Sequence, residues 1–108
     1  MTEMGKKYLS DILMAIEKIE SFIQDTPDFS SYEADIKTQS ATERQLAIIG
    51  EALNKFNKVE PTINIENDRQ IVAFRNRIIH SYDGIDNAIV WTILKRHLTI
   101  LKSEIENK

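Results

Sequence analysis

The chain has 108 residues, with 14 Lys or Arg against 17 Asp or Glu, a formal net charge of −3 and no cysteine. This length favours a single domain over residues 1–108 with one helical core. The absence of cysteine excludes disulfides and thiolate metal sites, and the acidic balance argues against broad, non-specific binding of nucleic acid.

The N-terminal residues lack a basic stretch followed by an apolar run, and no segment has the roughly 18 uninterrupted apolar residues that a membrane span needs. We therefore expect neither export nor membrane insertion, and the cytoplasm is the expected location. No pattern of metal ligands is visible, so we expect no metal and no cofactor.

The first predicted helix covers residues 4–25 and ends before Pro27, which cannot continue a helix. Its apolar residues recur at helical spacing, with charged residues between them. They are Tyr8, Leu9, Ile12, Leu13, Ile16, Ile19 and Ile23.

Two capping boxes are predicted next, Ser30 with Glu33 and Ser40 with Glu43, because a hydroxyl and a carboxylate at this spacing satisfy free backbone amides. They predict a short helix over 31–38 and a longer one over 41–57, either separate or continuous. Gly50 lies within the longer helix at a cost of about 1 kcal/mol relative to Ala. Such a glycine is typical of a position where two helices pack closely.

Residues 58–67 are predicted to form a loop. Asn67 or Asp68 is expected to cap the next helix, which Gly84 would end, and Asp86 to cap the last one. No segment alternates as a strand would, and no repeat is present. The predicted fold is an all-α bundle of four main helices.

The most informative stretch lies at the end of the helix that Asn67 or Asp68 would cap, just before Asp83 and Gly84. It combines guanidiniums, an amide, an imidazole and a phenol within eight residues: Arg75, Asn76, Arg77, His80 and Tyr82. Residues 69–82 contain three arginines and no Asp or Glu. This local cationic site suits a phosphate or an acidic partner, although cations at a helix C-terminus also complement the helix dipole.

Helix geometry limits what one copy of this stretch can do. At about 100° per residue, Asn76 and His80 share a face, so the Asn76 amide can orient the imidazole. Arg75 and His80 point about 140° apart in an ideal helix, so they do not obviously converge on one phosphate. Either the helix breaks near His80 or a second copy contributes.

The residues of this stretch are those needed to hold a phosphodiester and to move protons around it. Cleavage of such a bond also favours a second copy of the stretch. Cleaving RNA without a metal requires a base for the 2′-hydroxyl, stabilisation of a phosphorane and an acid for the departing 5′-oxygen. His80 can serve as base or acid, but not as both within one step. Arg75, with Arg77 as a further donor, can bind the phosphoryl oxygens. A two-fold homodimer would supply both proton-transfer groups.

With its Arg-x4-His-x-Tyr pattern formed by Arg75, His80 and Tyr82, and with a polar Asn76 after the arginine, the chain resembles the HEPN superfamily in the form found in HepT-type toxins. Residues 48–55, Tyr82 to Asp86 and Val90-Trp91 are similar to other stretches of the HepT group. The resemblance covers nearly the whole chain.

This resemblance implies a homodimeric bundle of four to five helices and a metal-independent endoribonuclease with Arg75 and His80 as catalytic residues. It also implies a toxin–antitoxin pair acting on RNA, with tRNA as one candidate substrate. The implied partner is a nucleotidyltransferase of the MntA kind that transfers AMP to Tyr82. An anion beside His80 would repel RNA phosphate, which makes such neutralisation physically sensible.

The alternative is a non-catalytic helical module that binds a nucleotidyltransferase or a nucleotide through its arginines. Outside the motif, Glu51 and Asn54 lie in the second stretch that is similar to the HepT group and could border the site, but the preferred interpretation is a solvated helix face. His97 is expected at an interface or at the edge of the core. Trp91 is expected to pack in the bundle or in a dimer interface rather than against a base.

Overall fold

The computed structural model describes residues 1–80 and 84–108, apart from the side chains of Ile79 and His80. The elements are α1 (Glu3–Phe22), a 3-10 turn (Ile23–Asp25), α2 (Phe29–Glu33), α3 (Ile36–Val59), α4 (Arg69–His80), α5 (Asn87–Thr92), a π-helical turn (Ile93–His97) and α6 (Leu98–Glu106). The described residues contain no strand, so the predicted all-α class is confirmed. Among the described residues, no helix is long and apolar enough to cross a membrane.

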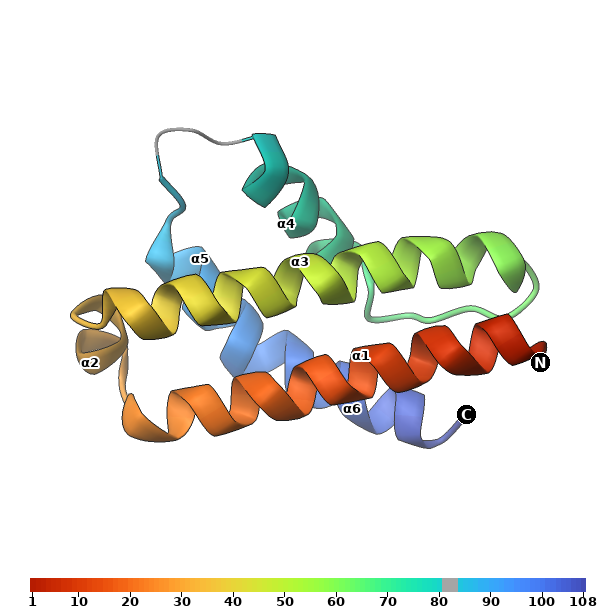
Figure 1. The fold of residues 1–108 in the computed structure, drawn as a ribbon, viewed down its shortest axis with the longest axis horizontal. Helices are drawn as coiled ribbons and strands as arrows, with labels where there is room; N and C mark the ends of the chain where they lie inside the picture. Colours follow the sequence, from red (N-terminus) through yellow and green to blue (C-terminus); the bar gives the residue numbers. More distant parts are fainter. Residues whose placement is uncertain (81–83) are drawn as a thin grey trace.

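Helices α1 and α3 run antiparallel along the length of the molecule, and α4 crosses the outer side of α3 (Figure 1). The run from α5 to α6 lies behind this pair. The four main helices of the prediction are therefore α1, α3, α4 and the α5–α6 run. Their apolar faces meet in one core, which contains Ile12, Ile16, Ile19, Leu46, Ile49, Leu53, Phe56, Ile71, Phe74, Val90, Leu94 and Leu101.

The starts of α2 and α3 differ from the predicted capping boxes. Asp28 accepts a hydrogen bond from the Ser31 amide at 2.8 Å and starts α2, whereas Asp35 accepts one from the Thr38 amide at 3.0 Å and starts α3. These backbone hydrogen bonds lower the pKa of both aspartates. An ionised carboxylate is a stronger acceptor than a hydroxyl, so the aspartates become the caps and Ser40 lies inside α3.

The loop between α3 and α4 is tied to the rest of the bundle. The Glu104 carboxylate on α6 accepts hydrogen bonds from the backbone amides of Glu66 at 2.8 Å and Asn67 at 3.2 Å. Burial opposes ionisation of Glu104, but these hydrogen bonds outweigh it and lower its pKa. The stabilisation is therefore present above the ordinary carboxylate pKa and is lost as the pH falls through the lower folded value. These hydrogen bonds therefore fix the position at which the chain enters α4.

The last helical run begins as predicted, because the Asp86 carboxylate accepts a hydrogen bond from the Ala88 amide at 2.9 Å. Trp91 packs inside the bundle, with its ring centroid 5.3 Å from that of Tyr32 and 6.4 Å from that of Phe29. Within the described residues α4 ends at His80, and Gly84 has a φ of 95°, a conformation that favours glycine.

Candidate functional site

Arg75 lies where α4 crosses α3 and has its side chain directed at that helix. Its Nη2 atom forms an ion pair with the Glu51 carboxylate of α3, and its Nη1 atom donates to the Asn76 side-chain oxygen at 3.0 Å. The Arg75 side chain is 24% exposed and that of Glu51 is 39% exposed. The two terminal nitrogens are therefore held in place while part of the guanidinium stays open to solvent.

Gly50 makes this close approach possible. A Cβ atom at position 50 would lie 2.3 Å from the Arg75 Cβ and 3.3 Å from the Ile71 carbonyl oxygen. The first distance is far below van der Waals contact, and neither atom is the free end of a flexible side chain. The predicted role of Gly50 in helix packing is confirmed, and the contact it allows is with the base of the Arg75 side chain.

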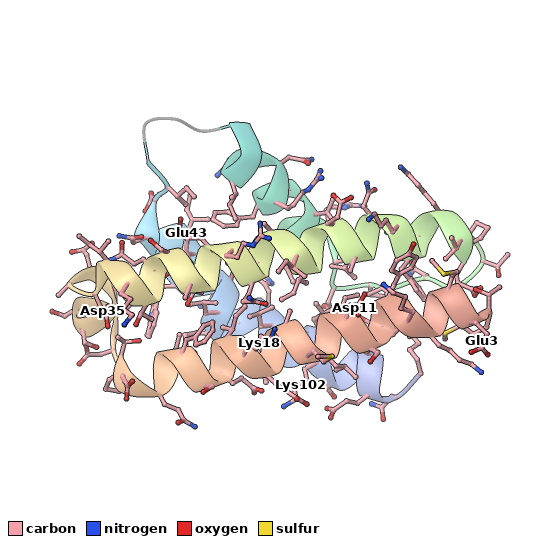
Figure 2. All side chains as sticks on the ribbon, viewed as in Figure 1. Glu3, Asp11, Lys18, Asp35, Glu43 and Lys102 are labelled. Atoms are coloured by element: carbon pink, nitrogen blue, oxygen red, sulfur yellow. The ribbon has the colours of Figure 1, made fainter. Side chains whose placement is uncertain are left out.

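The Arg75 guanidinium opens onto a groove between α1 and α3. This α1–α3 groove has a volume of about 470 Å³, and both Glu51 and Arg75 line it. On α1, Asp11 and Lys18 lie on the side that faces α3 (Figure 2). A guanidinium presents paired N–H donors that match the oxygens of a phosphate or carboxylate. An anion in the groove could therefore be bound by Arg75.

Arg77 points elsewhere. It is exposed on the opposite side of α4 and lines a second pocket of about 420 Å³, together with Phe74, Ile93 and His97. Two residues along a helix correspond to a rotation of about 200°, so Arg75 and Arg77 of one chain face different surfaces. The predicted position of His97 at the edge of the core agrees with its half-buried side chain in the π-helical turn.

The remaining motif residues lie partly or wholly outside the described part of the chain. His80 is the last residue of α4, but its side chain is not described, and Tyr82 falls in the undescribed segment. The hydrogen bond between Asn76 and His80 therefore stays a prediction. The backbone of His80 follows Arg75 by five helical residues, a rise of about 7.5 Å along α4.

Glu51 is the site residue for which the sequence left two interpretations open, and the preferred one does not describe its main contact. The interpretation in which Glu51 borders the site is the one that holds, because its carboxylate binds Arg75 and lies 3.7 Å from the Lys55 ammonium, while its side chain stays 39% exposed. Its position directly after Gly50 was the available signal, since a close helix crossing at Gly50 places the next residue beside the partner helix. Asn54, the other residue in that interpretation, is half-buried on the same helix.

Comparison with known proteins identifies the family of the chain. The sequence profile of the family described as "Ribonuclease HepT-like" matches residues 12–107, nearly the whole chain. The chain belongs to the HepT-like family. Its membership in the HEPN superfamily, indicated by the Arg-x4-His-x-Tyr pattern, is thereby confirmed.

Several relatives resemble this HepT-like chain over most of its length. A "Probable ribonuclease HepT" of Thermococcus cleftensis is 37% identical, over 98% of this chain and 96% of the relative. A "Putative RNase" of Methanocaldococcus jannaschii is 32% identical, over 94% of this chain and 93% of the relative. A second one from the same organism is 30% identical, over 94% and 87%. No solved structure gives a significant match.

Proposed function

We propose that this HepT-like chain is a metal-independent endoribonuclease that acts as the toxin of a toxin–antitoxin pair. The observation that carries the proposal is the position of the Arg75 guanidinium. Glu51 and Asn76 hold it at the open α1–α3 groove, and Arg75 lies on the same helix as His80. Membership in the HepT-like family and the ribonuclease names of the relatives support the same activity.

In the proposed reaction, Arg75 binds the phosphate that is cleaved. Negative charge accumulates on the non-bridging oxygens as the 2′-oxygen attacks, and a fixed guanidinium stabilises that charge without reorganising. Glu51 and Asn76 hold the Arg75 guanidinium until the phosphate enters. The phosphate oxygens then compete with the Glu51 carboxylate for the N–H donors of Arg75. Arg77 is the auxiliary cation of the proposal and faces a different surface of its own chain.

His80 moves the protons in this scheme. One imidazole accepts the 2′-hydroxyl proton, and a second imidazole donates a proton to the departing 5′-oxygen, leaving a 2′,3′-cyclic phosphate. A two-fold homodimer that brings two α4 C-termini to one cleft supplies both. Asn76 lies one helical turn before His80, so its amide can orient the ring.

The proposed antitoxin is an MntA-like nucleotidyltransferase that transfers AMP to Tyr82. The phenol lies two residues after His80 in the sequence, so an added nucleotide would place a negative charge and a bulky group near the imidazole. RNA phosphate would be repelled and obstructed. Modification of Tyr82 would thus switch off cleavage without changing any catalytic side chain.

The deciding experiment is cleavage of single-stranded RNA, including tRNA, by the purified protein in EDTA. His80→Ala is expected to lower the rate by about 10²- to 10⁴-fold, the usual contribution of general acid–base catalysis. Cleavage products of the unaltered protein should end in 2′,3′-cyclic phosphate. His97→Ala is the matched control, because His97 lies outside the α1–α3 groove, and it should cleave normally.

Four results would contradict the proposal. Equal rates for the unaltered protein and His80→Ala would show that His80 is not the general acid or base. A strict metal requirement would contradict metal-independent cleavage. A protein that is monomeric and fully active would exclude the two-histidine mechanism. The absence of any cleavage, together with binding of a nucleotidyltransferase or a nucleotide, would favour the non-catalytic module.

Tyr82→Phe is expected to keep cleavage and to escape neutralisation, because the ring remains while the hydroxyl that accepts AMP is lost. Intact-mass spectrometry after incubation with the nucleotidyltransferase and ATP should show a gain of AMP on the unaltered chain and none on Tyr82→Phe. Tyr32→Phe, whose altered ring is fully buried, should still gain AMP. A gain of AMP on Tyr82→Phe would assign the modification to another residue.

A further inference from the structure

The α1–α3 groove extends well beyond Arg75 on both sides. On α1 it is lined by residues 7, 11, 14 and 18, and on α3 by residues 44, 48, 51 and 55. Both sets have the spacing of a single helical face, and the two helices run antiparallel (Figure 1). At a rise of about 1.5 Å per residue, each face is about 16 Å long. The groove is thus an extended channel rather than a pocket for one small anion.

The charge of the groove is opposite to that of the whole chain. Its described lining residues include five cations, Lys7, Lys18, Arg44, Lys55 and Arg75, and two carboxylates, Asp11 and Glu51. The chain as a whole has a net charge of −3. A cationic channel on an acidic protein attracts a polyanion locally, without the general affinity that a basic surface would bring.

The carboxylates are already neutralised within the groove. Asp11 forms an ion pair with Lys7 at 2.9 Å, and Glu51 binds Arg75 with Lys55 at 3.7 Å. Lys18 and Arg44, by contrast, are exposed and form no ion pair with any described residue. These two cations are the ones free to bind an incoming anion.

Apolar residues also line the groove. Met14, Ala15, Ala47 and Ile48 line it, and Met14 is 54% exposed. The Tyr8 ring lies at the opposite end of the groove from Lys18, with the Lys7 ammonium 5.3 Å from its centroid. Cations along a groove with apolar and aromatic surface between them suit single-stranded nucleic acid, whose phosphates bind the cations while its bases cover the apolar surface.

We propose that the α1–α3 groove binds the single-stranded RNA that flanks the cleavage position, with Lys18 and Arg44 holding a phosphate apart from the one bound by Arg75. This inference rests on the proposed ribonuclease function, because it extends the substrate from the phosphate at Arg75. Arg44 precedes Glu51 by seven residues on α3, about 10 Å along the helix axis. A short single-stranded segment spans that interval.

The test uses the double variant Lys18→Gln/Arg44→Gln, which removes both free cations while keeping good helix formers at exposed positions. Binding of a labelled single-stranded oligoribonucleotide is measured by fluorescence anisotropy in a His80→Ala background, so that RNA is not consumed. The affinity is expected to fall about ten- to a hundredfold at low salt. The magnitude of the slope of log affinity against log salt should decrease by about 0.7, the value for one phosphate contact on a single strand.

The matched control is Lys37→Gln/Arg96→Gln, which removes one lysine and one arginine that are exposed outside the groove. It changes the net charge equally and should leave the affinity and the salt slope within about twofold of the parent, since distant surface charges are screened. In the His80-containing protein, Lys18→Gln/Arg44→Gln should raise KM for RNA and leave kcat nearly unchanged, because the removed contacts are far from the reacting phosphate.

The outcomes separate this inference from the ribonuclease proposal. Normal cleavage with unchanged RNA affinity in the double variant would overturn the groove assignment and leave the ribonuclease intact. Groove-dependent RNA binding without cleavage by the unaltered protein would support the groove and contradict the ribonuclease. Unchanged RNA affinity with weakened binding of the nucleotidyltransferase, or of a second copy, would assign the groove to a protein and overturn the inference.

Discussion

Replacing Arg75 by lysine is expected to reduce RNA cleavage by about 10²- to 10³-fold, the usual cost of removing one preorganised donor from a developing oxyanion. Lysine keeps the positive charge but has a single nitrogen. In the structure, two nitrogens of Arg75 are used at once, one by Glu51 and one by Asn76. A lysine cannot keep one contact that orients it and also offer a paired donor to a phosphate.

The measurement is the single-turnover rate of RNA cleavage with protein in excess, compared among the unaltered protein, Arg75→Lys and Arg75→Ala. The two variants should be impaired to a similar degree. Arg69→Lys is the control, because Arg69 is an exposed residue at the start of the same helix and lines neither pocket. If Arg75→Lys kept its rate within about threefold, only the charge would matter, and the oxyanion role given to the guanidinium would be wrong.

Gly50→Ala is expected to destabilise the protein and to impair cleavage together. On helix propensity alone the change would stabilise α3 by about 1 kcal/mol. The added methyl group, however, would lie 2.3 Å from the Arg75 Cβ, so α4 must move away. Overpacking of this kind typically costs about 1–3 kcal/mol, which exceeds the propensity gain.

The same movement displaces Arg75, and a misplacement of about 1 Å can reduce a rate by about 10²-fold. The free energy of unfolding is measured by chemical denaturation and the cleavage rate in the same buffer. Gly5→Ala is the control: its added methyl group would meet the side chains of Glu60 at 2.9 Å and Met1 at 3.0 Å, well away from Arg75, so cleavage should persist. A more stable Gly50→Ala protein with normal cleavage would show that the helix crossing does not set the position of Arg75.

The helices were predictable because their apolar residues recur at a period that only a helix places on one face. The ends of helices were less predictable. Several polar residues compete for each cap. Asp28 and Asp35 are the caps instead of Ser30 and Ser40, because their carboxylates accept hydrogen bonds from nearby backbone amides. The spacing of a capping box does not tell which of these competing residues becomes the cap. The predicted cap at Asp86 is confirmed.

The candidate site was predictable in its composition but not in its surroundings. The motif indicated Arg75 as an anion-binding residue, and the resemblance to HepT-type toxins gave it a role. The partner that holds Arg75, Glu51, lies 24 residues earlier on another helix, and its contact depends on how α3 and α4 cross. Likewise, the α1–α3 groove depends on the antiparallel register of two helices, which periodicity within each helix does not determine.

The loop before α4 links the site to a helix that contributes no residue to it. Since Glu104 fixes the backbone of Glu66 and Asn67, and Asn57 donates to the Asp68 carboxylate at 2.9 Å, the entry to α4 is anchored to α6 and α3 together. A change in α6 is therefore expected to shift the start of α4 without altering any residue that lines the α1–α3 groove. Substitutions in the last turns of α6 are therefore expected to reach Arg75 through the entry to α4.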